Sequence, residues 1–474
     1  MTSFPVGPTL PGGPARLPHP PHDAMRAPLT RINPTFRRIL LSQSAQSSNQ
    51  SSQSQAHGLP LDPLWLGSVS SVTHALGLFR CEFSGLKNLR SFQALLFALA
   101  VPTLALAEEK PSPSPTPYRE PFAQSFPIRQ EQHLQLKAYA DKLLQTQADR
   151  ALLSLAPDFS SPAAYERSLA PYRARLSATY GTPPPGAREG RVTKILHVGE
   201  DADCTIYRVW IEVIDGVDAY GLYLVPKKLS VSARTASGRA PLLIAQHGGG
   251  GNPEAIVDLD TRANYHSFGR AAVRRGYAVW APALAMRSAF SGDPAIPGAS
   301  RELLDQKLRL AGTSIIGLEL HKILESTRTL LRTRPEIDPA RVGMTGLSWG
   351  GFFTMYATAL APFIKVAAPS GYLRDTAAIL TRATTDTATA ADRDLFDDLG
   401  HFQALALICP RPCLVEIGEQ DGTINPMPGA RAEAERAAAY YQKLGVPDRF
   451  QFSTHPGGHE FDPQTILAFF DRHL

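Results

Sequence analysis

The sequence Gly346-Leu347-Ser348-Trp349-Gly350 lies between a strand-like segment and a helix-like segment. Residues 341–345 are typical of a buried strand, and residues 351–356 begin a helix-like run. A serine between strand and helix, with glycine two places to either side, is typical of a strained turn that exposes a nucleophile. The pattern alone arises by chance in roughly one chain in six of this length. The rest of the chain therefore has to support it.

Residues that can activate a serine follow in a fixed order. Asp421 lies in the turn after the apolar segment 412–418, and His459 comes after a last predicted strand and two glycines. Acid and histidine after the ends of neighbouring strands can meet, so the sequence predicts the triad Ser348, Asp421 and His459. Asp375, which follows the preceding strand, is the rival acid, and His455 is the rival base.

Two other carboxylates lie near Asp421. Glu416 falls inside the predicted strand and Glu419 falls too early in the following turn, so both fit a structural role better.

A glycine-rich loop follows the apolar segment 240–246 and reads His247-Gly248-Gly249-Gly250-Gly251. Loops at this place can supply one backbone N–H to a developing oxyanion, and the residue after the nucleophile supplies the other. The expected donors are Gly248 or Gly249 together with Trp349. No lysine followed by serine or threonine comes after the loop, which argues against a nucleotide phosphate site.

Charge separates the front of the chain from the remainder. The whole sequence carries 48 Lys and Arg against 43 Asp and Glu, a net charge of +5. Counting residues 1–107 gives eight basic and three acidic side chains, so the excess of five lies there and residues 108–474 hold 40 of each sign. We expect no nucleic-acid partner. We also expect no cofactor and no metal, since no zinc-type spacing is present.

The first 107 residues do not read as a folded domain. Residues 1–86 are rich in proline, serine and glutamine, which indicates disorder or an over-extended reading frame. Residues 87–107 combine a basic flank, an apolar run and an Ala-Leu-Ala end, and so are typical of a signal peptide cleaved after Ala107. The sequence predicts an exported protein with no stable membrane association after cleavage. A membrane anchor and an ordinary buried segment remain alternatives.

Residues 108–187 read as a proline-rich linker followed by a helical extension packed on the main domain. The expected helices are residues 129–153 and a second stretch from Pro162 to about Gly181. From 188 to 474, three strands form an antiparallel entry and then strands alternate with helices. This alternation predicts an α/β fold with a mostly parallel central sheet and helices on both faces.

Two features of this part stay open. Residues 284–312 and 373–402 are candidate insertions over the active face, and the second is a candidate lid. Cys409 and Cys413 are expected to be buried free thiols, although a bridge is conceivable.

Three of these segments together resemble a known family. They are His247-Gly248-Gly249-Gly250, the run from Arg334 to Gly343 that leads into the serine turn, and Gly457-Gly458-His459-Glu460-Phe461. Residues 188–474 resemble the secreted bacterial α/β-hydrolases that are grouped with acetyl-xylan-esterase-like and dienelactone-hydrolase-like enzymes. Dienelactone hydrolases proper carry a cysteine nucleophile, whereas this chain has Ser348.

The resemblance implies a serine carboxylesterase that deacylates small or carbohydrate esters through an acyl-enzyme. A serine peptidase of prolyl-oligopeptidase type is the alternative, although no repeat-built propeller is evident in the sequence. A hydrolase fold kept as a non-catalytic binding module is the third possibility.

Overall fold

The computed structural model describes residues 117–153, 155–229, 238–259, 263–285, 301–383, 399–422 and 427–474. All of them belong to one compact unit, Pro113–Leu474. The predicted extension 1–86, the signal-like segment 87–107 and most of the proline-rich linker lie outside the described residues. Residues 286–300 of the candidate insertion 284–312, and residues 384–398 of the second insertion, also lie outside them.

A single sheet of nine described strands forms the centre of the molecule, in the order β1-β2-β3-β5-β4-β6-β7-β8-β9. The first three strands and the β3–β5 pair are antiparallel, and all pairs from β5 through β4 to β9 are parallel. This confirms the predicted antiparallel entry and mostly parallel sheet. The strands are β1 Ala187–Glu200, β2 Cys204–Ile214, β3 Val217–Pro226, β4 Ala240–Gln246, β5 Ala278–Pro282, β6 Ile337–Leu347, β7 Val366–Ser370, β8 Cys413–Gly418 and β9 Phe450–His455.

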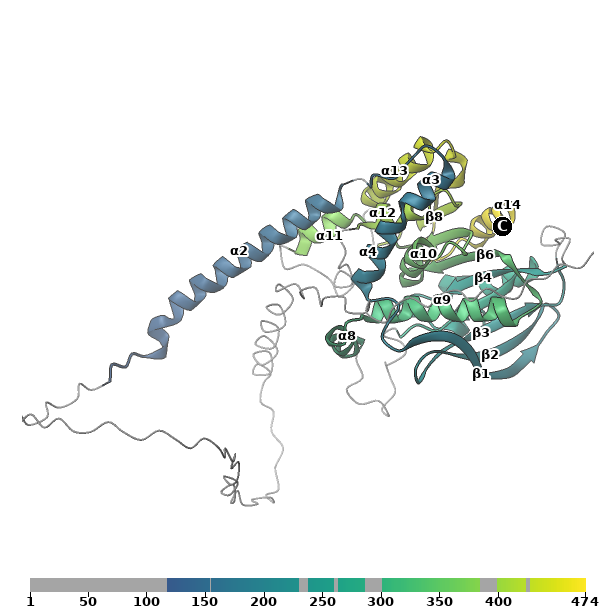
Figure 1. Cartoon of the computed structure of the whole chain (residues 1–474), viewed down its shortest axis with the longest axis horizontal. Coiled ribbons are helices and arrows are strands. Elements are labelled where there is room, and N and C mark those ends of the chain that lie inside the picture. Colours follow the sequence, from purple (N-terminus) through teal and green to yellow (C-terminus); the bar gives the residue numbers. More distant parts are fainter. Residues whose placement is uncertain are drawn as a thin grey trace, which may run out of the picture. The chain divides into compact units, whose positions relative to one another are not determined.

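Helices cover both faces of this sheet (Figure 1). Strand β4 shows why, because its seven residues are all buried and successive side chains enter two different cores. Leu242 and Ile244 pack into one core, and Leu243 and Ala245 pack into the other. The longer helices are α2 Phe126–Ala151, α3 Pro162–Ser168, α4 Ala170–Tyr180, α6 Phe268–Arg274, α8 Arg301–Leu310, α9 Ile315–Thr333, α10 Trp349–Leu360, α11 Thr376–Ala383, α12 His401–Ile408, α13 Met427–Lys443 and α14 Pro463–His473.

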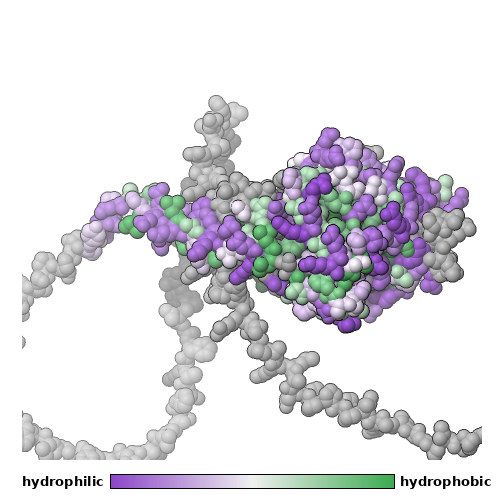
Figure 2. All heavy atoms as spheres, turned by 90° about the horizontal axis from the view of Figure 1, so that it is seen from above, coloured by the Kyte–Doolittle hydropathy of each residue, from purple (hydrophilic) through white to green (hydrophobic). Residues whose placement is uncertain are grey.

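The N-terminal helices pack less uniformly than the sequence predicts. Tyr165 of α3 and Leu176 of α4 are fully buried in the core that also contains Leu242 and Ile244 of β4. These two helices therefore belong to the main domain. Helix α2 instead lies beside α11 near its C-terminal end and leaves most of its length exposed (Figure 1). Several of its apolar side chains are exposed, among them Ile128 and Tyr139. The molecule's exposed hydrophobic residues are coloured green in Figure 2. Helix α2 therefore packs on the domain through its C-terminal part, where Ala148 contacts Leu380 of α11.

The cysteines follow the prediction of free thiols. Cys204, Cys409 and Cys413 are unpaired and buried. Burial raises the pKa of the Cys409 thiol to about 12, which keeps it protonated and unreactive at neutral pH.

Candidate active site

Ser348 occupies a sharp turn between β6 and α10. Its φ of 62° and ψ of −122° lie outside the regions that side-chain-bearing residues normally adopt. The flanking glycines make this turn possible. A Cβ on Gly346 would lie 2.5 Å from the carbonyl carbon of Gly350, and a Cβ on Gly350 would lie 2.2 Å from the carbonyl oxygen of Gln246. The predicted strand–turn–helix is thus present.

Backbone hydrogen bonds fix the two sides of this turn. The N–H of Ser348 donates to the carbonyl of Ser370 at 2.9 Å, and the N–H of Phe352 donates to the carbonyl of Ser348 at 3.0 Å. Trp349 is the first residue of α10, where an N–H has no acceptor within the helix. Its amide can therefore serve a ligand held beside Ser348.

His459 and Asp421 meet after the ends of β9 and β8. Nδ1 of His459 lies 2.7 Å from Oδ2 of Asp421, and the Asp421 side chain is only 1% exposed. A carboxylate only accepts, so we assign the proton to Nδ1, which leaves Nε2 able to accept one. The loop of Gly371, just after β7, places this pair next to the serine turn. A Cβ on Gly371 would lie 3.0 Å from Leu347 and 3.3 Å from Cε1 of His459.

The rival acids and the rival base have other partners. Oδ1 of Asp375 accepts from the N–H of Ala378 at the start of α11. Nε2 of His455 lies 2.6 Å from Oε1 of the buried Glu416 carboxylate. Glu419 accepts from the hydroxyl of Thr454. Among the carboxylates considered from the sequence, Asp421 is the one in contact with His459.

The glycine-rich loop lies against the nucleophile. A Cβ on Gly248 would be 3.1 Å from the Cβ of Ser348. The N–H of Gly248, however, donates to the hydroxyl of Tyr265 at 2.9 Å. The predicted donor Gly248 thus already has a partner for its N–H in this structure. The half-buried Gly249 remains as the candidate from this loop.

The orientation of the Gly249 amide follows from its neighbours. The carbonyl of Gly248 accepts from Nδ1 of His247 at 2.9 Å and from the N–H of Gly251 at 3.1 Å. The peptide that joins Gly248 to Gly249 is trans, so its N–H points away from that carbonyl. The N–H of Gly249 is therefore turned away from the residues that hold the loop.

His247, the first residue of the glycine-rich loop, has a structural role that the sequence analysis did not assign. It is buried, and its Nε2 accepts from the N–H of Leu284 at 3.0 Å while Nδ1 contacts the carbonyl of Gly248. These two contacts require the neutral ring with its proton on Nδ1. Burial lowers the pKa of His247 to about 4, which keeps the ring neutral above that pH. Tyr265 was also missed, since no motif marks it.

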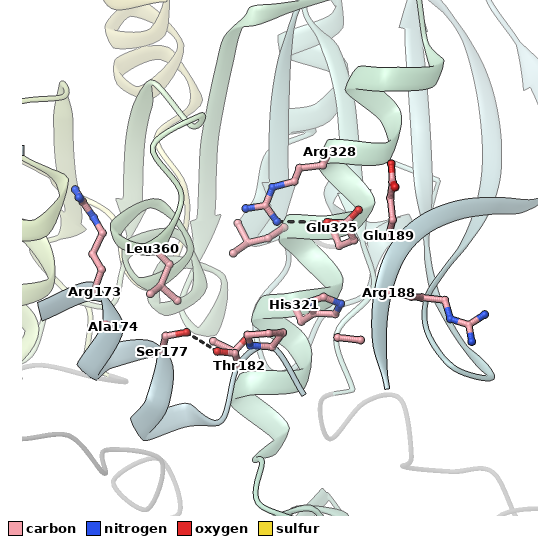
Figure 3. A pocket seen from close by; sticks show the side chains of 13 residues that line it. Arg173, Ala174, Ser177, Thr182, Arg188, Glu189, His321, Glu325, Arg328 and Leu360 are labelled. Atoms are coloured by element: carbon pink, nitrogen blue, oxygen red, sulfur yellow. Dashed lines mark hydrogen bonds and ion pairs between the residues drawn. The ribbon is translucent and has the colours of Figure 1, made fainter. Parts of the chain in front are cut away.

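A cavity of about 570 Å³ lies apart from these residues, between α4, the start of β1 and α9 (Figure 3). Its polar side chains already have partners within the protein. Arg173 donates to the carbonyls of Ala359 and Leu407, and Glu325 accepts from the N–H of Gly190. None of the predicted site residues lines this cavity, and its geometry points to no chemistry.

The described residues contain no group of three or more His, Cys, Asp or Glu side chains placed to hold a metal ion. None of the helices within the described ranges is long and apolar enough to cross a membrane.

Comparison with known proteins agrees with this architecture. Residues 256–398 match the model of the Dienelactone hydrolase family. A solved structure assigned as an acetyl xylan esterase from Bacteroides fragilis NCTC 9343 has a TM-score of 0.52 at 16% identity, over 66% of this chain and 81% of that chain. A CE15 glucuronoyl esterase from Caldicellulosiruptor kristjansonii has a TM-score of 0.46 at 20% identity, over 68% and 91%. An acetyl xylan esterase from Paenibacillus sp. R4 has a TM-score of 0.43 at 17% identity, over 70% and 99%.

None of the curated proteins matches the sequence. The likeness to the Bacteroides protein is a likeness of fold. The resemblance inferred from the sequence is thereby confirmed at the level of the fold, and the chain is an α/β-hydrolase in architecture.

Proposed function

We propose that the protein is a serine carboxylesterase that cleaves small or carbohydrate acyl esters. One observation carries the proposal: His459 and Asp421 are 2.7 Å apart, beside a serine held on a sharp turn with a positive φ. A serine hydroxyl at its ordinary pKa is a weak nucleophile, and a histidine oriented by a carboxylate is the usual group that activates it.

In the proposed reaction, Oγ of Ser348 forms a bond to the ester carbonyl carbon while its proton moves to Nε2 of His459. Asp421 stabilises the resulting imidazolium through Nδ1–H and stays ionised. The carbonyl oxygen becomes an oxyanion, which accepts from the N–H groups of Trp349 and Gly249. The C–O bond to the alcohol then breaks, and the proton on His459 moves to the leaving oxygen.

Water completes the cycle by the same route. It attacks the acyl group on Ser348 and gives one proton to His459, and that proton returns to Oγ as the carboxylic acid leaves. Every proton is carried by the protein, so the proposal needs no cofactor.

The substrate class rests on the likeness to esterases. The Dienelactone hydrolase family match and the Bacteroides structure, assigned as an acetyl xylan esterase, favour a small acyl group on an alcohol or sugar. The proposal includes export, on the strength of the signal-like sequence 87–107.

Hydrolysis of p-nitrophenyl esters by the full chain tests this function. We expect turnover of acetate and butyrate and almost none of peptide p-nitroanilides. Ser348→Ala should lower kcat by at least about 10³-fold because no nucleophile remains. Its melting temperature should match or exceed that of the parent, because alanine adopts the strained backbone conformation of this turn no less readily than serine does. Peptide cleavage at a higher rate than ester cleavage would favour the peptidase, and a folded parent without either activity would favour a binding module.

A further inference from the structure

The short segment Ala263–Ser267 lies between the two loops that carry the proposed catalytic groups. It forms the 3₁₀ turn η2, Ala263–Tyr265, followed by His266 and Ser267. These last two residues have φ values of 47° and 53°, in the left-handed region that residues other than glycine rarely adopt. Two such residues in succession persist only where surrounding contacts hold them, and they are commonest at functional sites.

One set of these contacts reaches the glycine-rich loop. The hydroxyl of Tyr265 accepts from the N–H of Gly248 at 2.9 Å. The same hydroxyl leaves no room for a side chain at Gly251, where a Cβ would lie 2.0 Å from it. Tyr265 is 2% exposed, so water does not readily replace its hydroxyl as the acceptor.

A second set reaches the loop that carries His459. The carbonyl of Asn264 accepts from the N–H of Phe461 at 3.0 Å, and Nε2 of His266 lies 2.8 Å from the Glu460 carboxylate. The rings of Tyr265 and Phe461 are also in contact, with centroids 6.0 Å apart. The two residues that follow His459 in sequence are therefore both tied to this segment.

We propose that Tyr265 is a positioning residue, whose hydroxyl orients the glycine-rich loop so that the N–H of Gly249 can meet the oxyanion. The inference rests on the proposed function. With its N–H held by Tyr265 and its carbonyl held by His247 and Gly251, Gly248 has both of its backbone polar groups fixed. The next peptide plane is then fixed as well, and so is the direction of the Gly249 N–H. An N–H donor that is already oriented costs no reorganisation energy when negative charge develops on the carbonyl oxygen of the ester.

Loss of the hydroxyl should act on the transition state more than on substrate binding. In Tyr265→Phe the buried N–H of Gly248 has no acceptor and is free to turn toward the cleft, which moves the adjacent amide. Misplacement of a catalytic group by about 1 Å can cost as much as 10² in rate. We therefore expect kcat for p-nitrophenyl acetate to fall about 10- to 100-fold while KM changes less than about twofold.

Tyr277→Phe is the matched control. Tyr277 is also 2% exposed and belongs to the same core, and its hydroxyl donates to Asp471 at 2.8 Å, away from the proposed site. Both variants remove one buried tyrosine hydroxyl with a partner. Only Tyr265→Phe should change kcat.

A second variant reaches the same contact from the opposite side. Gly251→Ala would push its methyl group into the hydroxyl of Tyr265 and should lower kcat with the same small change in KM.

The experiment measures kcat, KM and melting temperature for the full chain, the three variants and Ser348→Ala. It adds the inhibition constant of a methyl trifluoromethyl ketone, which forms a tetrahedral adduct with the serine. We expect this constant to rise for Tyr265→Phe by the factor that kcat/KM falls, since both depend on the oxyanion donors. Wild-type kcat in Tyr265→Phe, or equal losses in Tyr265→Phe and Tyr277→Phe, would overturn the role of Tyr265 alone. An inactive parent would overturn the proposed function and this inference with it.

Discussion

The turn around Ser348 and the loop around His459 are held in place by different kinds of contact. At the serine turn, backbone atoms approach so closely that only glycine fits at Gly346, Gly350 and Gly351. At the histidine loop, backbone hydrogen bonds are joined by two ion pairs whose partners come from other parts of the chain. The glycines of the serine turn lie within six consecutive residues, although they pack on the backbone of Gln246 and Ser370, whereas the ion pairs of the histidine loop join residues up to 194 positions apart.

An ion pair lies near each end of the histidine loop. His455 pairs with Glu416 of β8 at its start, and Glu460 pairs with His266 near its end. Between them, Gly418 packs so tightly that a Cβ there would lie 2.0 Å from the carbonyl oxygen of Gly458. The loop therefore combines one glycine contact of the first kind with two ion pairs of the second.

The largest effect in either region should come from Asp421→Asn. Asparagine fits the same space, but it cannot favour the correct tautomer of His459 or balance the imidazolium. We expect kcat to fall by about 10⁴-fold, with little change in melting temperature. Asp375→Asn is the control, because Asp375 caps α11 and does not touch His459. A larger loss of kcat in Asp375→Asn than in Asp421→Asn would reassign the acid.

Gly350→Ala tests whether the serine turn depends on backbone contact. Its methyl group would lie 2.2 Å from the carbonyl oxygen of Gln246, and neither backbone can move without disturbing β4 or α10. We expect a loss of about 3 kcal/mol in the free energy of unfolding, measured by urea denaturation.

The matched control for this substitution is Gly250→Ala in the glycine-rich loop. A Cβ on Gly250 would meet nothing within 4 Å, so that variant should keep the stability of the parent. Equal stabilities of the two variants would show that the turn tolerates adjustment, and the contrast with the histidine loop would fail.

The difference between the two regions also explains what the sequence could predict. The serine turn, its strand and its helix follow from local spacing, and so does the alternation that yields the parallel sheet. The contact between His459 and Asp421 was expected because parallel strands end at one edge of a sheet. The serine turn, the parallel sheet and the contact between His459 and Asp421 are all specified by neighbouring residues or by the order of the strands.

The roles of Tyr265 and His247 could not be predicted in this way. The acceptor for the N–H of Gly248 lies 17 positions along the chain, in a turn that carries no recognisable pattern. Gly248 and Gly249 were therefore equivalent in sequence, and only a tertiary contact separates them. Helix α2 illustrates the same limit, since its sequence indicates a helix but not how much of the helix is covered.

The smallest predicted effect concerns the ion pair at the start of the histidine loop. The Glu416 carboxylate beside His455 raises the pKa of that imidazole, and the nearby Asp462 and Glu460 act in the same direction. A pKa raised by folding means that the native state binds the proton more tightly than the unfolded chain. The stabilisation is therefore complete below about pH 6.5, the ordinary value for histidine, and it is lost as the pH rises through the raised pKa.

Glu416→Gln should consequently lower the free energy of unfolding by about 1.5 kcal/mol near pH 5.5, and by less at pH 8.5. Urea denaturation at both values measures the change. Glu319→Gln is the matched control, because Glu319 is equally buried at 1% exposure but pairs with Lys322, so its effect should not vary over this range. A pH-independent cost for Glu416→Gln would mean that the histidine loop, like the serine turn, is held by uncharged contacts, since only a titrating partner can make the contribution of Glu416 fade with pH.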